Sequence, residues 1–339
     1  MTNPIEALLA EKGVLLADGA TGTNLFNMGL LSGEAPELWN ESEPGKISAL
    51  HQNFVDAGAD IILTNSFGGT RHRLKLHNAQ DRVHELNKRA AELARAVADK
   101  AGRKVVVAGS VGPTGELLEP LGTMTYEDAV DAFSEQIRGL KEGGAEIAWI
   151  ETMSAPGEAK AAAQAAIDVG LPYTYTVSFD TAGRSMMGLA PKDIHGVVEG
   201  LPEEPVGVGA NCGVGAPDIL AALLDMTKAK PEATVIVKGN CGIPQFHGTE
   251  IRYSGTPELM ADYVRLAVDS GAKIIGGCCG TSFEHLAAMR QALDSHHKGP
   301  RPTLETIVER IGPLRNKTAD QSGESAEGAE PRRERRRRS

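Results

Sequence analysis

Eight short runs of apolar residues recur along the chain, and this recurrence is the feature that most constrains its fold. Each run is four or five residues long, and a glycine or a polar side chain follows within two residues. Runs that are apolar at consecutive positions are typical of parallel strands buried on both faces. The runs are residues 14–17, 60–64, 104–108, 146–150, 173–177, 205–209, 234–237 and 273–276.

Amphipathic helical patterns alternate with these runs. They cover roughly residues 47–55, 82–101, 126–142, 156–169, 192–200, 217–228, 257–270 and 283–295. Eight strand–helix units in a chain of 339 residues predict an α/β fold, a single (β/α)8 TIM-type barrel. A doubly wound sheet is the alternative, but such a sheet is more often built as two halves, and the composition shows no break near the middle.

Two shorter helical patterns flank these units, at residues 5–11 and 303–311. We expect the first to close the bottom of the barrel. From about residue 316 the chain loses its apolar residues, and residues 332–338 are nearly all arginine. Such segments cannot bury enough apolar surface to fold. We therefore predict a barrel domain over residues 1–314 and a disordered basic tail over residues 315–339.

The charge of the chain is acidic and unevenly distributed. The formal net charge is −10 at pH 7, and residues 317–339 hold seven basic and five acidic side chains, so the remainder is near −12. An acidic body argues against a nucleic-acid-binding surface.

Signals for export and membrane insertion are missing from the sequence. The first six residues do not form a basic segment followed by an apolar one, as in a signal peptide. No run of about 18 apolar residues occurs. Four cysteines, two of them adjacent, do not make a disulfide framework. We expect a cytoplasmic protein with no membrane partner.

Polar side chains follow most of the eight runs. In a (β/α)8 barrel the carboxyl ends of the strands meet at one face, and that face carries the active site. Because apolar residues alone define the runs, the coincidence indicates one catalytic face. The predicted site residues are Asp18, Gly19, Asn65, Ser110, Glu151, Asn211, Cys212, Asn240, Cys278 and Cys279.

Three of the four cysteines follow the sixth and eighth runs, and we predict that they bind one Zn²⁺ per chain. Zinc takes thiolates in a tetrahedron, and three protein ligands leave a fourth position for water or substrate. Cys212 would face Cys278 and Cys279 across the barrel mouth. Adjacent strand residues point to opposite faces, so the pair can reach one ion only where the backbone turns, and the flanking glycines permit that turn.

A soft thiolate site favours a thiol substrate. A free thiol is mostly protonated at pH 7, whereas coordination removes its proton and leaves a nucleophile suited to alkyl transfer. The alternative is that the cysteines are small buried apolar residues. Cys241 and His285 are the candidates for a fourth protein ligand, and otherwise Cys241 lines the pocket.

Carboxylates and glycine-rich loops supply the other predicted contacts. Asp18 and Glu151 could bind a substrate ammonium group, although Asp-Gly is also a turn dipeptide and Glu151 could pair with a neighbouring loop. The loops at 19–23 and 109–115 can present backbone N–H groups to a phosphate or a carboxylate, and neither has the lysine of a P-loop.

Six segments of this predicted face carry a family resemblance. They are DGATGT at 18–23, TNSFG at 64–68, GSVGP at 109–113, ETM at 151–153, GANC at 209–212 and GGCCG at 276–280. In this order they resemble the successive motifs of the homocysteine S-methyltransferase family. That family includes the homocysteine-binding module of cobalamin-dependent methionine synthase and betaine–homocysteine methyltransferase. The resemblance covers about residues 5–312, and the Asn-Cys and Gly-Gly-Cys-Cys pair is highly specific.

The resemblance implies a methyltransferase in which a zinc-bound homocysteine thiolate attacks a methyl donor and gives methionine. It implies that the three cysteines hold the zinc ion and that Asp18 and Glu151 engage the homocysteine amino group. Backbone groups near Gly19 and Ser110 would meet its carboxylate.

The resemblance leaves two methyl donors open. Betaine needs aromatic faces around its trimethylammonium group, and Trp39 and Phe67 lie near the expected mouth. Gly68, however, stands where the betaine enzymes have a tyrosine. Residues 65–70 look more like the methionine synthase module, and its donor, methylcobalamin, would here come on a separate corrinoid protein.

Two other interpretations stay open. The chain could be a catalytically silent homocysteine-binding subunit of a split methionine synthase. It could also be an unrelated TIM-barrel lyase, for which Lys238 is the one candidate catalytic lysine at a strand end.

Overall fold

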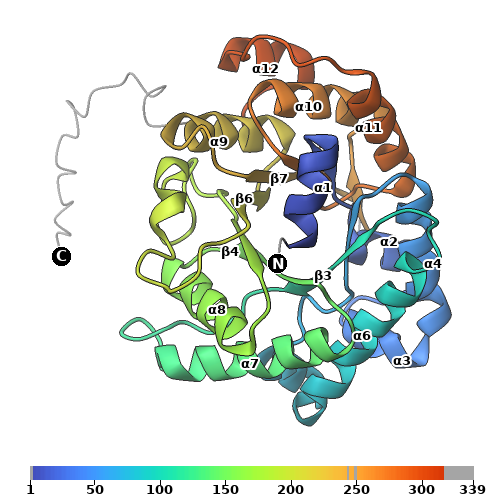
Figure 1. Ribbon diagram of the computed structural model, residues 1–339, viewed down its shortest axis with the longest axis vertical. Helices are drawn as coiled ribbons and strands as arrows, with labels where there is room; N and C mark the ends of the chain where they lie inside the picture. The colour runs from blue at the N-terminus through green and yellow to red at the C-terminus, as the bar shows by residue number, and fades with distance from the viewer. Residues whose placement is uncertain (1–2, 243, 248–249, 317–339) are drawn as a thin grey trace, which may run out of the picture.

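The computed structural model of the chain describes residues 3–242, 244–247 and 250–316, and the predicted disorder at 317–339 lies outside them. A ring of eight parallel strands stands at its centre, surrounded by helices, as predicted for a (β/α)8 barrel (Figure 1). The strands are β1 (Leu15–Leu16), β2 (Ile61–Leu63), β3 (Val106–Val111), β4 (Ile147–Met153), β5 (Tyr173–Val177), β6 (Gly207–Cys212), β7 (Val235–Gly239) and β10 (Ile274–Gly277).

The strands pair in the order β1-β10-β7-β6-β5-β4-β3-β2. The ring closes between β1 and β2, where a parallel bridge joins Ala17 to Ile61 and the Asp18 N–H donates to the Ile61 carbonyl at 3.0 Å. Strands β3, β4 and β6 each extend three residues beyond the predicted runs. Four predicted site residues, Ser110, Glu151, Asn211 and Cys212, therefore lie within strands, where backbone pairing restrains their positions.

Helices pack around the outside of the ring. They are α2 (Thr21–Asn27), α3 (Trp39–Ser42), α4 (Pro44–Asp56), α5 (Arg71–Leu74), α6 (Val83–Ala98), α7 (Tyr126–Glu142), α8 (Pro156–Val169), α9 (Ala216–Ala229), α10 (Pro257–Asp269), α11 (Phe283–Ser295) and α12 (Leu304–Ile311). Local signals set their ends: Thr125 and Asp128 form a capping box at the start of α7. The prediction of an α-helix at 192–200 was wrong. A 3-10 helix, η4 (Pro191–Gly196), lies there instead, because Gly196 disfavours continuation as an α-helix.

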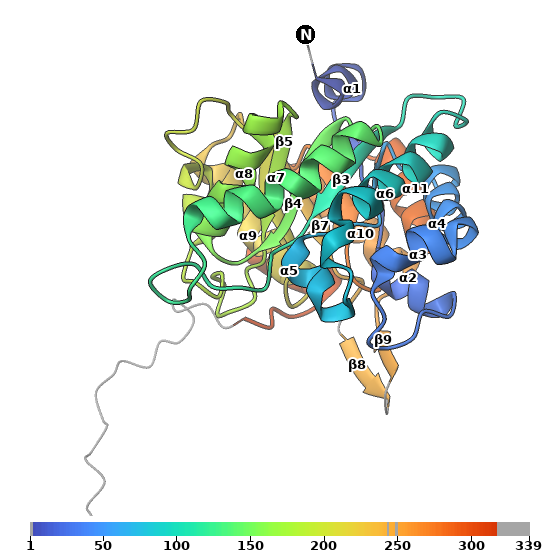
Figure 2. The same cartoon turned by 90° about the horizontal axis from the view of Figure 1, so that it is seen from below.

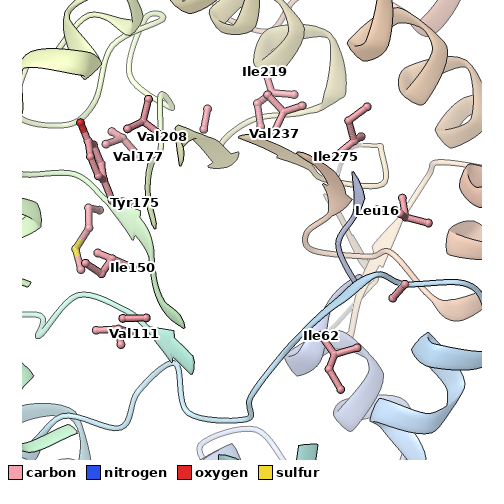
Figure 3. Packing of buried hydrophobic residues seen from close by; sticks show 14 of the residues in the cluster. Leu16, Ile62, Val111, Ile150, Tyr175, Val177, Val208, Ile219, Val237 and Ile275 are labelled. Carbon is pink, nitrogen blue, oxygen red and sulfur yellow. The ribbon is translucent and has the colours of Figure 1, made fainter. Parts of the chain in front are cut away.

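Side chains alternate along the strands between the barrel interior and the helical layer. Leu15 of β1 and Ala17, which directly follows that strand, belong to the interior cluster, whereas Leu16 belongs to the outer one. Figure 3 shows residues of the outer cluster, such as Ile62 and Val237, pointing from the strands toward the helices. This alternation explains why the runs are apolar at consecutive positions.

Helix α1 (Pro4–Lys12) closes the amino-terminal end of the barrel, as predicted. Ile5 and Leu8 are buried in the interior cluster. Asp60, at the start of β2, accepts the Lys12 ammonium at 2.6 Å and the Leu16 N–H at 2.9 Å. The bottom of the barrel is therefore sealed by apolar contacts and by a buried carboxylate.

An antiparallel hairpin of β8 (Pro244–His247) and β9 (Glu250–Tyr253) follows β7. Sequence analysis did not predict it. Figure 2 shows that it projects from the face opposite α1, beyond the carboxyl ends of the barrel strands. It therefore stands beside the mouth where the site residues gather.

The last described residues pack on the barrel. The backbone N–H groups of Arg315 and Asn316 donate to the Asp218 carboxylate at 2.8 to 3.1 Å, and the Asn316 side chain donates to the Phe179 carbonyl. Two residues assigned to the tail are thus held beside the first turn of α9.

Within the described part of the chain, the structure contains no helix that is both long and apolar enough to cross a membrane.

Candidate active site

The inward rows of side chains that fill the barrel end in polar residues at the mouth. On β4, Ile147 and Trp149 fill the interior, and Glu151 is the next residue on the same face. On β7, Lys238 follows the interior residue Ile236 in the same way. Strand alternation alone therefore directs a carboxylate and an ammonium group into the mouth, and both are buried.

The sulfurs of Cys212, Cys278 and Cys279 all lie within 4.8 Å of one another. The Sγ atoms of Cys212 and Cys279 are 3.9 Å apart. Two thiolates bound to one tetrahedral zinc, each at about 2.3 Å, are about 3.8 Å apart. The donor set and its spacing therefore fit a zinc ion that keeps one position free of protein ligands.

Backbone turns bring these sulfurs together. The Thr281 N–H donates to the Cys278 carbonyl at 3.1 Å, and Gly280 has a φ of +80°. A Cβ on Gly277 would lie 2.2 Å from Thr281 Cγ2, so the turn has no space for a side chain there. Cys212 itself has a φ of +61°, a left-handed conformation that is unfavourable for a residue with a Cβ. The rest of the site must hold it there.

Asn211 supports the thiols from β6. Its Oδ1 accepts the Thr152 N–H at 2.8 Å and the Thr176 hydroxyl at 2.7 Å. Its Nδ2 donates to the Thr152 hydroxyl at 2.7 Å and points at the Cys278 sulfur at 3.8 Å. The amide predicted to bind substrate therefore joins three strands and one sulfur.

Asn240 has the same arrangement on the other side of the group. Its Nδ2 donates to the Gly213 carbonyl at 2.9 Å and contacts the Cys212 sulfur at 3.8 Å. Its Oδ1 accepts the Cys279 N–H at 3.1 Å. Amide donors on a thiolate stabilise its negative charge, so the two asparagines are suited to orient the sulfurs.

Tyr253, at the end of β9, is a contact that sequence analysis missed. Its ring packs against Gly280, and its proximity to Cys279 lowers the pKa of that thiol. No strand was predicted at β9, so nothing in the sequence pointed Tyr253 toward the mouth. Site residues were predicted where a polar residue follows an apolar run. Tyr253 follows a largely polar segment, so this pattern does not identify it.

The metal-free thiols hold their protons strongly. The hydrogen bond with Cys278 and burial raise the pKa of Cys212 to about 12. The hydrogen bond with Cys212 and burial raise the pKa of Cys279 to about 11. Both are thiols at pH 7, and a bound cation would displace their protons.

The carboxylates form a second polar group beside the sulfurs. Asp18 pairs with Lys238, with 2.8 Å between Oδ1 and Nζ. Glu151 accepts the Ser110 hydroxyl at 2.5 Å. Burial lowers the pKa of Lys238, but the charges of Asp18 and Glu151 outweigh burial, so its pKa is raised. A protonated, ion-paired amine does not suit a lyase that needs a neutral lysine nucleophile.

The other predicted residues lie further from the sulfurs or face other groups. The Asn65 side chain donates to the Pro36 carbonyl and to Asn40, so its amide holds the loop behind β2. Gly19 packs against the turn at Thr281, where a Cβ would lie 2.6 Å from the carbonyl oxygen.

Neither candidate fourth ligand joins the sulfur group among the described residues. Cys241 is fully buried in the apolar core, and burial raises its pKa to about 12. The His285 ring caps α11 by contacting Ser282, and its Nε2 faces the Gly255 carbonyl. The described residues therefore provide three protein ligands for a metal ion, Cys212, Cys278 and Cys279.

Fold and site together define a (β/α)8 barrel enzyme with a three-thiol group at its catalytic face. The model of the homocysteine S-methyltransferase family matches residues 15–293, and the chain belongs to this family. The three sulfurs are the group in the described residues that could hold a metal ion in this family member.

Two curated relatives are methionine synthases. The chain is 30% identical to that of Mycobacterium leprae over 319 residues, which are 88% of this chain and 26% of the relative. It is 30% identical to that of Mycobacterium tuberculosis over 299 residues, which are 83% of this chain and 24% of the relative. The chain spans about a quarter of the length of these relatives.

Among solved structures, the metallated form of the homocysteine methyltransferase MmuM from Escherichia coli is similar in fold and in length. It is 25% identical, with a TM-score of 0.71, and the match covers 85% of this chain and 99% of that one. A single barrel of this size is therefore a whole chain in at least one solved relative.

Proposed function

We propose that this chain is a zinc-dependent homocysteine S-methyltransferase that makes methionine. The observation that carries the proposal is the group formed by Cys212, Cys278 and Cys279, whose spacing fits one zinc ion. Family membership supplies the substrate class. We also propose that the catalytic unit is the barrel of residues 1–314. Arg315 and Asn316 bind to this barrel through Asp218, so they extend the unit by two residues.

The three cysteines would hold the ion. Bound there, zinc would stabilise homocysteine as a thiolate at neutral pH, at the position left free of protein ligands. The chain's own part is orientation. Asn211 and Asn240 hold the cysteines, Glu151 is available to a substrate ammonium group, and backbone near Gly19 and Ser110 would meet the carboxylate.

Methyl transfer itself needs little more than alignment. A bond forms between the homocysteine sulfur and the methyl carbon, the donor loses its bond to that carbon, and the thiol proton goes to solvent. Barrel walls that exclude water around the sulfur favour this displacement, because a desolvated thiolate is a stronger nucleophile.

The aromatic residues at the mouth favour a corrinoid-bound methyl donor over betaine. Trp39 is only 8% exposed, and the Lys46 ammonium lies 4.4 Å from the centre of its ring. The cation–π site that betaine would need is therefore occupied by the chain's own lysine. We propose methylcobalamin on a separate corrinoid protein as the donor.

Apolar side chains around the mouth support a protein donor. Eight of the eleven large apolar side chains exposed among the described residues lie in the connections from β1 to α4, β2 to α6, β3 to α7 and β5 to η4, on the side of the barrel where the strands end. Apolar side chains exposed on one face are typical of a docking site. The eight are Phe26, Leu31, Phe67, Leu76, Leu117, Leu121, Met186 and Met187.

Betaine is the second candidate donor. Phe67 is 38% exposed in the loop after β2, and its ring packs beside Gly112. One accessible ring can contribute to binding a trimethylammonium group, although such groups are usually held by several.

A parallel donor assay tests the proposal. Zinc-loaded protein and homocysteine would be incubated with betaine, S-methylmethionine, free methylcobalamin or a methylated corrinoid protein, and methionine would be measured. We expect methionine in the corrinoid arms and little from betaine. Turnover with betaine alone would overturn the donor, and turnover only with S-adenosylmethionine would overturn both donors. Homocysteine binding without turnover in any arm would indicate a silent subunit.

A further inference from the structure

The two carboxylates at the mouth have different surroundings. Asp18 is 1% exposed, and both of its oxygens have partners inside the protein. Oδ2 accepts the Leu63 N–H at 2.7 Å, and Oδ1 accepts the Lys238 ammonium at 2.8 Å. A substrate ammonium group at Asp18 would therefore compete with an ammonium group that is already there.

Glu151 is the more accessible of the two. It is 8% exposed, and the Ser110 hydroxyl donates to Oε1 at 2.5 Å. Within the described part of the chain no donor bonds to Oε2. This oxygen is thus the carboxylate atom at the mouth that is left for a ligand.

Lys238 cannot exchange its partner for water. It is 2% exposed, and its Nζ lies 5.9 Å from the centre of the Trp149 ring, which forms the floor below it. Asp18 and Glu151 together raise its pKa against the effect of burial, so it is charged at neutral pH. Burial raises the pKa of both Asp18 and Glu151, and the Lys238 charge opposes that rise. When both carboxylates are ionised, the three side chains carry one net negative charge between them.

We propose that Lys238 is a specificity-determining residue, which neutralises Asp18 and leaves Glu151 as the single acceptor for the ammonium group of the substrate. The proposal rests on the proposed function and deepens it. A buried net charge of −1 is matched by a thiol that carries one ammonium group. Lys238 acts through Asp18 and Glu151 and does not contact the substrate.

Paired substitutions separate this arrangement from direct binding by Asp18. Homocysteine binding to zinc-loaded protein would be measured by calorimetry, beside 4-mercaptobutyrate, which lacks the amino group. Asp18→Asn leaves the Lys238 ammonium without its partner, next to Glu151. We expect it to weaken homocysteine binding at least about tenfold and 4-mercaptobutyrate binding much less.

The double variant D18N/K238M removes both charges of the pair. Its net charge at the mouth is again −1, on Glu151, and the side-chain amide oxygen that D18N introduces can still accept the Leu63 N–H. We expect homocysteine affinity to return to within about threefold of wild type. If the double variant binds as weakly as D18N, Asp18 contacts the substrate and the proposal is overturned.

A second set of paired substitutions keeps Asp18 and tests whether Lys238 prevents Asp18 from binding the substrate ammonium group. Glu151→Gln in the wild-type background should weaken homocysteine binding about thirtyfold, because no unpaired carboxylate remains for the ammonium group. In the K238M background, Asp18 is free to take the ammonium group, so the same substitution should cost less than about fivefold. Equal losses in the two backgrounds would overturn the proposal.

Zinc content and thermal unfolding of each variant would be measured as controls, to check that the metal site and the fold are intact. Failure of the wild-type, zinc-loaded protein to bind homocysteine would overturn the proposed function, and this inference with it. Binding by wild type without rescue in either cycle would overturn the inference alone.

Discussion

Cys212 and Cys241 lie at the carboxyl ends of neighbouring strands, but only Cys212 belongs to the sulfur group. The Cys212 sulfur is 3.9 Å from that of Cys279, whereas Cys241 is packed in the apolar core. Both are cysteines near the carboxyl end of a strand, with Cys212 as the last residue of β6 and Cys241 two residues beyond β7. The difference comes from the left-handed turn at Cys212, which redirects its side chain into the mouth.

This difference leads to a test of the metal site. Cys212→Ser should reduce bound zinc well below one per chain and lower kcat/KM at least about a thousandfold, because two thiolates hold zinc weakly. Cys241→Ala is the matched control and should keep one zinc per chain. Metal content after dialysis is the measurement. Zinc retained in the first variant, or lost in the second, would contradict the assignment of ligands.

At the scale of elements, the two ends of the barrel use buried carboxylates differently. Asp60 at the bottom binds Lys12 of α1 and Arg290 of α11, and so ties both helices to β2. Asp18 at the mouth binds Lys238 beside the sulfurs. The first arrangement holds elements together, and the second sets the charge of a site.

Asp60→Asn should therefore destabilise the fold without affecting the site. The neutral amide weakens charge-assisted hydrogen bonds to Lys12 and Arg290, and we expect a loss of about 2–3 kcal/mol in the free energy of unfolding. Zinc content should stay at one per chain. Glu11→Gln, an exposed change on α1, is the control and should stay within about 0.5 kcal/mol of wild type. Urea unfolding provides the comparison, and equal stability of both variants would refute the role of Asp60.

At the scale of the whole molecule, one buried histidine links stability to pH. His51 lies on the inner face of α4, and neither ring nitrogen has a hydrogen-bond partner in the described structure. Burial lowers its pKa to about 4. The ordinary pKa is about 6.5, so between these values the unfolded chain takes up a proton that the folded chain does not.

Stability should consequently fall as pH is lowered from about 6.5 to about 4. At about 1.4 kcal/mol per pH unit, the full loss from His51 is about 3 kcal/mol. His51→Phe removes the titrating group and should flatten this part of the profile. Unfolding free energies at pH 7, 5.5 and 4.5 test the prediction. An unchanged slope in the variant would show that other groups cause the acid sensitivity.

Much of the architecture could be predicted from the chain because its signals are local. Short runs that are apolar at consecutive positions identified all eight barrel strands, and amphipathic spacing identified most of the helices between them. Features that lack a local signal were missed. The β8–β9 hairpin contains no continuous apolar run, and the short helix η4 replaces a longer one because Gly196 lies within it.

The candidate site also has features that the sequence predicts and features that only the tertiary structure determines. Its residue types, and their place at the ends of strands, followed from the sequence, because parallel strands bring all their carboxyl ends to one face. Which of those residues meet is a matter of tertiary structure alone. Lys238 reaches Asp18 across 220 residues of chain, and the Asn211 amide contacts the Cys278 sulfur. Hydrogen bonds between distant segments leave no periodicity in the chain, so only the closed barrel determines which charges and sulfurs become neighbours.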